Sequence, residues 1–178
     1  MRKLWFTLGF IWLLPATLLV WLLYVLPLWA LGYIKLDSIK WPVVEFKLKA
    51  VGNWYAKLWK KWWGWSGPCV YIYEDTDYII LNDGVEEQHR AWLNVQAKVT
   101  ETHEVRHCLQ QLIFGPLHYP LYGLSSLVLW IYGTVANKDI HSYYDNPFER
   151  DARKNAGQPV HIPRSQWSDG PNDRNPWG

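Results

Sequence analysis

Residues 4–34 contain no charged side chain, and this apolar stretch restricts what the chain can fold into more than any other feature of the sequence. It is 31 residues long, whereas one helical membrane crossing needs about 20. The apolar core of a secretory signal peptide has only about 7–15 residues, so the stretch is too long for one. Pro15 and Pro27 predict kinks. We therefore expect either one tilted, kinked span or a segment that enters the bilayer and returns, because two full crossings do not fit.

Basic and aromatic side chains are concentrated in the first third of the chain. Residues 1–66 hold 9 Lys/Arg, 2 Asp/Glu and 10 of the 14 Trp, whereas residues 67–178 hold 9 Lys/Arg and 14 Asp/Glu. The run 53–65 alternates Trp and Tyr with Lys. Trp and Tyr favour the headgroup level of a bilayer, and Lys pairs with anionic lipids. This run predicts an interfacial helix on the lipid surface. Basic-aromatic runs also bind single-stranded nucleic acid, but directly after a membrane segment the lipid interpretation is favoured, so no nucleic-acid partner is expected.

The basic residues that flank the apolar stretch favour one orientation. Arg2 and Lys3 precede it, and four lysines follow it closely: Lys35, Lys40, Lys47 and Lys49. Since loops on the cytoplasmic side carry an excess of Lys and Arg, this count predicts that the part after the anchor is cytoplasmic.

His103, Glu104 and His107 form a His-Glu-x-x-His pattern. No Gly or Pro occurs between Gly84 and Gly115, and the periodicity predicts a helix that stops at Gly115-Pro116. On a helix the two histidines lie one turn apart, with their β-carbons about 5–6 Å from each other. Two imidazoles at that spacing can hold one zinc ion, and the adjacent carboxylate can take a proton from water on that ion.

A catalytic zinc ion needs three protein ligands and one open position. Later in the chain, Asn146-Pro147 predicts a helix start, with Asn as the cap and Pro in the first turn. Glu149 in that first turn is the expected third ligand. Asp151 is a competing ligand, and Asp145 is a weaker one.

Further polar residues near the two motifs are candidates for supporting roles. An oxyanion donor is needed for peptide hydrolysis, and the candidates just before the second motif, which the residues alone do not rank, are His141, Tyr143 and Tyr144, with Tyr144 as our working assignment. Gln110 and Asp151 are expected to orient the histidines.

The order of these two motifs resembles that of the gluzincin clan of zinc metallopeptidases, in particular its small members, the minigluzincins. The resemblance covers about residues 69–156 and is carried by His103-Glu104-Val105-Arg106-His107 and by Asn146-Pro147-Phe148-Glu149. Phe114-Gly115-Pro116-Leu117 and the hydrophobic segment after it also look like membrane-associated peptidase-like proteins of bacteria and their phages. The resemblance implies zinc held by His103, His107 and Glu149, with Glu104 as general base. It does not identify the substrate, which a peptidase function would make a peptide or protein.

Residues 112–136 form a second uncharged run. By hydropathy alone it could cross a membrane. A crossing would, however, separate His107 from Glu149 by about 30 Å, whereas both must approach one zinc ion to about 2.0–2.2 Å. We therefore expect a loop-helix that returns to its own side, broken by Pro116, Pro120 and Gly123.

Together these patterns predict an α+β fold, in which an N-terminal membrane helix precedes a small zincin-like domain. Its expected parts are a short β-hairpin (69–73 and 78–81, joined by an acidic turn), the motif helix and a second ligand-bearing helix, with a further extended piece at 44–49. The spacing of Cys69 and Cys108 matches no metal-ligand pair, so both are expected to be reduced and partly buried. The expected divisions are a membrane segment at 1–34, a basic aromatic segment at 35–66, a peptidase-like domain at 67–156 and a disordered tail at 157–178.

The leading hypothesis is a membrane-anchored, zinc-dependent peptidase. The alternative is a non-catalytic membrane protein that retains a zinc-binding fold for a structural or interaction role. A third hypothesis is a small membrane-perturbing lysis protein, for which the motif would be coincidental. Glu104 favours catalysis, because a purely structural zinc site has no use for a base.

Overall fold

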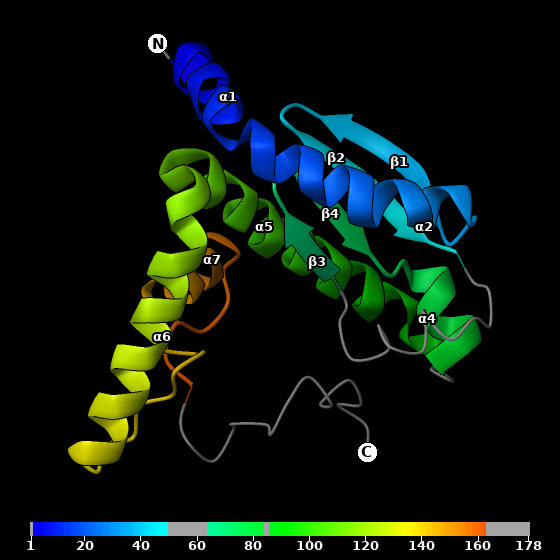
Figure 1. Cartoon of the computed structure of the whole chain (residues 1–178). Helices are drawn as coiled ribbons and strands as arrows, with labels where there is room; N and C mark the ends of the chain where they lie inside the picture. Colours follow the sequence, from blue (N-terminus) through cyan, green and yellow to red (C-terminus); the bar gives the residue numbers. More distant parts are fainter. Residues whose placement is uncertain (1, 50–63, 84–85, 163–178) are drawn as a thin grey trace.

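The computed structural model describes residues 2–49, 64–83 and 86–162 (Figure 1). Helices and one four-stranded sheet make up this part of the chain. The mixed architecture agrees with the expected α+β class.

The apolar N-terminal stretch forms one helical rod. Helix α1 (Arg2–Val20) continues through a π-helical turn (Trp21–Val25) into α2 (Leu26–Ala30). The portion Thr7–Ala30 has 24 residues and a mean hydropathy of 2.1, so it is long and apolar enough to span a membrane. At 1.5 Å per residue it measures about 36 Å. Because the helix is continuous, the alternative in which the stretch enters and turns back is wrong.

The sheet has the strand order β1-β2-β4-β3. Strands β1 (Ile34–Lys40) and β2 (Val43–Leu48) are antiparallel and are joined at the cis Trp41-Pro42 peptide bond. Strand β4 (Val70–Tyr73) lies parallel to β2, and β3 (Gly64–Gly67) pairs antiparallel with β4 at the sheet edge. Strand β2 confirms the extended piece expected near 44–49.

Part of the predicted interfacial helix at 53–65 is contradicted. Its last two residues, Gly64 and Trp65, belong to strand β3. The remainder of that prediction, residues 53–63, lies outside the described residues.

The two faces of the sheet carry different helices. Val70 and Ile72 share a core with Val25 and Leu28 of the N-terminal helix. Tyr71, between them in sequence, points to the opposite face because side chains alternate along a strand. There it packs with Val43 of β2 and Cys108 of helix α5 (Arg90–Phe114), so the sheet lies between the N-terminal helix and α5. Cys69 and Cys108 are both free and buried.

The second strand of the predicted hairpin is wrong. Residues 76–83 form helix α4 (Thr76–Asp83) instead of a strand at 78–81. A four-residue apolar run fits a helix or a strand equally well, and Asp77 in the first turn favours the positive end of the helix dipole. Strand β4 takes its neighbours from residues 43–48 and 64–67, so it has no free side for residues 78–81.

Helix α5 (Arg90–Phe114) carries the motif and ends where Gly115-Pro116 predicts. Gly115 has a φ of +58°, and a β-carbon there would collide with Trp12 of α1, so glycine is required at this corner. After a 3-10 turn (Gly115–Leu117), α6 (His118–Val135) continues through Pro120 and Gly123. Both residues were expected to break the helix, and neither does. Pro120 lies in the first turn, where proline is tolerated. The chain then returns to α7 (Pro147–Asn155), beside α5 (Figure 1).

Candidate metal centre

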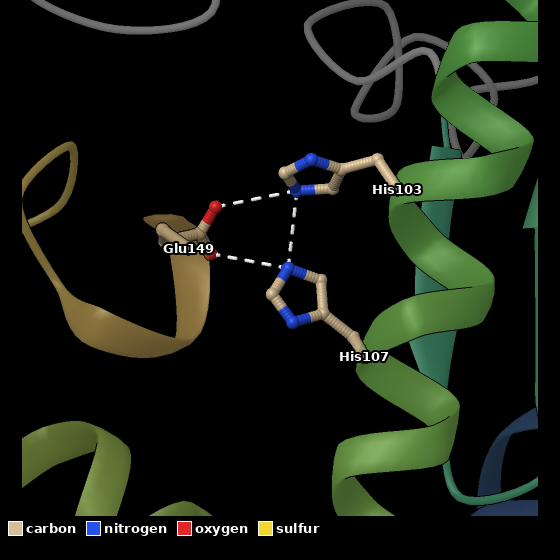
Figure 2. Close-up of side chains that lie close together, drawn as sticks. All are labelled: His103, His107 and Glu149. Carbon is tan, nitrogen blue, oxygen red and sulfur yellow. Dashed lines mark hydrogen bonds and ion pairs between the residues drawn. The ribbon is translucent and has the colours of Figure 1, made fainter. Parts of the chain in front are cut away.

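Three side chains that could hold a metal ion converge between α5 and α7. His103 and His107 project from α5, and Glu149 faces them from the first turn of α7 (Figure 2). The two Nε2 atoms are 3.1 Å apart, and the Glu149 carboxylate oxygens lie 3.2 Å from Nε2 of His103 and 3.3 Å from Nε2 of His107. All three residues are buried, so this cluster could hold a metal ion.

The opposite nitrogen of each imidazole faces a glutamine. Nδ1 of His107 lies 2.8 Å from Oε1 of Gln110, and Nδ1 of His103 lies 2.9 Å from Oε1 of Gln158. The amide nitrogen of Gln110 donates to the Phe148 carbonyl and to Asp151. Those two acceptors require the amide nitrogen on their side, so the oxygen of Gln110 must face the ring. An amide oxygen only accepts, and Nδ1 of His107 therefore carries its hydrogen.

This hydrogen-bond pattern leaves electron pairs facing one another at the centre of the cluster. A neutral imidazole protonated at Nδ1 exposes a lone pair at Nε2. With both rings in that form, two lone pairs and a carboxylate point into one small, buried space. Only a proton or a cation can hold such a set together.

The spacing suits a tetrahedral ion. Zinc bonds to histidine nitrogen and carboxylate oxygen measure about 2.0–2.2 Å. Two ligands at that distance and at the tetrahedral angle are separated by about 3.3–3.5 Å. The three observed separations, 3.1–3.3 Å, are close to this value. The donor set of two imidazoles and one carboxylate is also one that catalytic zinc uses.

The local sequence explains why Glu149 faces the histidines. The Asn146 side chain accepts a hydrogen bond from the Phe148 backbone N–H, which caps α7 as expected. Asn146 is fully buried, and its amide also donates to α6, at the carbonyl of Tyr122 and the hydroxyl of Ser126. The Tyr122 hydroxyl donates to Glu149 Oε1 over 2.8 Å. Both the cap and the carboxylate are therefore fixed by α6.

The two competing acidic residues lie elsewhere. Asp151 accepts two hydrogen bonds from Arg106 and one from Gln110. Asp145 accepts a hydrogen bond from the backbone N–H of His141. Asp151 thus contacts the site only through Gln110, which in turn contacts His107.

Charge within the cluster alters the pKa values of its members. Burial disfavours protonation of His107, but hydrogen bonding to Glu149 and the carboxylate charge outweigh it and raise the pKa of His107 above 6.5. Burial also disfavours the charged form of Glu149, but hydrogen bonds from His103 and His107 win and lower the pKa of Glu149 well below its usual range. Both shifts favour a charged pair between His107 and Glu149 when no metal is bound.

Glu104 points from α5 toward the sheet edge. The Ser66 hydroxyl of β3 donates to Glu104 Oε2 over 2.6 Å. The Glu104 carboxylate therefore lies against the edge strand, and its charge also contributes to the raised pKa of His107.

The three candidate oxyanion donors have different surroundings. Tyr144 packs its ring against His141 and under the guanidinium of Arg153, which is 4.8 Å from the ring centroid. His141 Nδ1 accepts from the backbone N–H groups of Tyr143 and Tyr144. Burial and the charges of Glu149 and Glu104 raise the pKa of Tyr143. Both site carboxylates thus act on Tyr143, while the assignment of Tyr144 stays a prediction.

Sequence reasoning missed several residues that contact the site. Gln158 belongs to the tail that was expected to be disordered, and no local signal connects it with His103. Ser66 gave no signal either, because its strand was not expected. Tyr122 could have been found, since it falls on one helical stripe with His118 and Ser126.

Comparisons of the chain with family models, with curated proteins and with solved structures give no match.

Proposed function

We propose that this chain is a zinc-dependent peptidase of the gluzincin type, anchored to a membrane by its N-terminal helix. The observation that carries the proposal is the convergence of His103, His107 and Glu149 at tetrahedral spacing, with a histidine tautomer that exposes Nε2 to the centre. Because Gln110 holds the hydrogen of His107 on Nδ1, the neutral ring presents a lone pair, and no hydrogen-bond donor, to Glu149.

His103, His107 and Glu149 would hold the ion and leave its fourth position for water or substrate. When bound there, zinc supplies Lewis acidity: it polarises a peptide carbonyl and lowers the pKa of water from roughly 15.7 to about 7.

The chain's own groups account for the proton transfers. Glu104 accepts a proton from the attacking water and passes it to the leaving amine. The hydrogen bond from Ser66 holds that carboxylate in place. Tyr143 is the preferred donor to the developing oxyanion, because the charges of both Glu149 and Glu104 act on it, which indicates that it lies near the site. Tyr144 is the alternative donor.

The unpaired edge of strand β3 favours a peptide as the substrate. It is the last strand of the sheet, and among the described residues no strand pairs with its outer edge. An extended peptide can add to such an edge through backbone hydrogen bonds. Because Ser66 of β3 contacts Glu104, a peptide paired with this strand would pass close to the general base.

The N-terminal helix supplies the proposed anchor. Its outward face carries large apolar side chains that are 49–76% exposed, among them Leu8, Ile11, Leu19, Leu22 and Leu23. A helix that is apolar on all sides suits a lipid environment. The lysines after the anchor favour the cytoplasmic side for the catalytic part.

Metal analysis and one substitution test the proposal. The purified full chain should contain about one zinc per chain, and His103→Ala should lose it. Glu104→Gln should keep the zinc and lower peptide cleavage by about 10²–10⁴-fold. Exposed Glu87 provides the matched control, and Glu87→Gln should change neither property. Zinc binding without cleavage of any member of a peptide library would favour the non-catalytic alternative, and absence of zinc would contradict both.

A further inference from the structure

Helix α6 has its polar and apolar sides reversed relative to a helix of a water-soluble protein. Its less exposed stripe is polar or small at most positions and comprises His118, Tyr122, Ser125, Ser126, Leu129 and Gly133. Its exposed side carries the large apolar residues, including Leu124, Leu127, Val128, Trp130, Ile131 and Val135, which are 46–81% exposed. A helix in water buries its apolar stripe. A helix in lipid turns small and polar residues toward protein and apolar ones toward the acyl chains.

The polar stripe receives the chain that returns from the end of α6. A β-carbon on Gly133 would lie 3.0 Å from the Ile140 carbonyl oxygen, so the returning segment passes close to the helix there. Further along, Asn146 donates to Tyr122 and Ser126, and the Tyr122 hydroxyl reaches Glu149. The helix and the returning segment therefore form a hairpin whose inner side holds the cap and the metal ligand.

Helix α6 extends away from the sheet (Figure 1). No Asp, Glu, Lys or Arg occurs between Arg106 and Lys138. Eighteen helical residues measure about 27 Å, which is nearly the hydrocarbon thickness of a bilayer. The base of α6 adjoins α1 through the contact of Gly115 with Trp12, so the exposed apolar surfaces of the two helices are neighbours there.

We propose that α6 is a second lipid-inserted element and that its insertion keeps Glu149 in position to bind metal. The occupant of its apolar face is the acyl-chain region of a bilayer. Contact with lipid fixes the position of α6. The less exposed stripe of α6 then fixes the position of α7 through Asn146 and Tyr122. The second half of this proposal rests on the proposed metal centre, whereas the first half does not.

Spin labels on the full chain in phosphatidylcholine vesicles test the insertion. Leu127→Cys and Ile131→Cys, each carrying a nitroxide, should collide several-fold more often with oxygen than with a water-soluble nickel chelate. Lys98→Cys, on the exposed polar side of α5, is the control and should show the opposite ratio. Labelling the unaltered chain checks that buried Cys69 and Cys108 do not react. If the labels on α6 meet the nickel chelate as often as the Lys98 label does, lipid is not the occupant and the proposal is overturned.

Cobalt binding, followed by visible absorption, tests the coupling independently of peptide cleavage. In vesicles, Leu127→Lys/Ile131→Lys should weaken cobalt binding by at least tenfold, although neither side chain belongs to the metal cluster. The matched double variant at two exposed apolar residues outside α1 and α6, Leu81→Lys/Val95→Lys, should change it less than twofold. Unchanged cobalt affinity in the α6 variant overturns the coupling. If the unaltered chain binds no cobalt, the metal centre and the coupling both fail, and the spin labels still decide the insertion.

Discussion

Ser66 on the edge strand donates its hydroxyl hydrogen to Glu104 on the motif helix, with 2.6 Å between the two oxygens. This bond connects the sheet edge directly to the proposed general base. In the proposed peptidase, it would also place the base close to a peptide strand added at this edge.

Removing the hydroxyl in Ser66→Ala should lower kcat while leaving zinc bound. A hydrogen bond to a charged group contributes about 1.5–3 kcal/mol, which corresponds to a loss on the order of tenfold to a hundredfold if Glu104 loses its position. Steady-state cleavage with parallel metal analysis measures this. Ser125→Ala, on α6, is a serine control. A Ser66→Ala enzyme with unchanged kcat would show that Glu104 is positioned by other contacts.

Gln110→Ala should weaken zinc binding by about 10–100-fold, the usual cost of removing a partner that orients a ligating histidine. The glutamine fixes the tautomer of His107 and ties it to Phe148 and Asp151 on α7. Competition with a zinc chelator measures the affinity. Gln96→Ala, two turns of α5 before His103, should have no effect. Equal affinities for both variants would contradict the assigned tautomer.

Asn146→Ala should lower both stability and metal affinity. Loss of a helix cap costs about 0.5–2 kcal/mol, and the variant also leaves the Ser126 hydroxyl without its amide donor. We expect a total loss of about 2 kcal/mol, from the cap and from the buried hydrogen bonds. Chemical denaturation of the detergent-solubilised chain, with and without zinc, checks the prediction. Stability unchanged in both conditions would mean that α6 does not support α7.

The metal-free chain should respond to pH in the opposite sense from the zinc-bound chain. The raised pKa of His107 adds stability that is complete below its unfolded value of 6.5 and is lost as pH rises through the folded value. The lowered pKa of Glu149 adds stability that is complete above pH 4.5, its unfolded value, and is lost as the pH falls further. The pair therefore stabilises the metal-free chain most between these values. Zinc requires a neutral His107, so its stabilisation grows with pH.

Calorimetry at about pH 5.5 and about pH 8 separates the two states. Without metal, the Tm of the unaltered chain should exceed that of Glu149→Gln, which removes the carboxylate charge of the pair. This difference should be larger at the lower pH. Zinc should raise the Tm more at the higher pH. A metal-free pH profile identical to that of Glu149→Gln would show that the ion pair does not form.

The sequence predicted the metal cluster more completely than the sheet. Helical periodicity and the Asn-Pro start are local signals, and both elements formed where expected, so His103, His107 and Glu149 met as the spacing required. The failed strand at 78–81 shows the limit of local signals: strand β4 pairs with a segment more than 20 residues earlier, and pairing over that distance has no local signature. Gln158 illustrates the same limit, because its contact with His103 depends on where α7 ends.

In the sequence, the two histidines of the cluster precede α6 and Glu149 follows it. During synthesis both histidines are therefore made before Glu149, and the apolar helix α6 is made between them. Until residue 149 has emerged and folded back, the nascent chain holds at best a weak, two-ligand site. The proposed metal site is therefore complete only after α7 has been made and has packed beside α5.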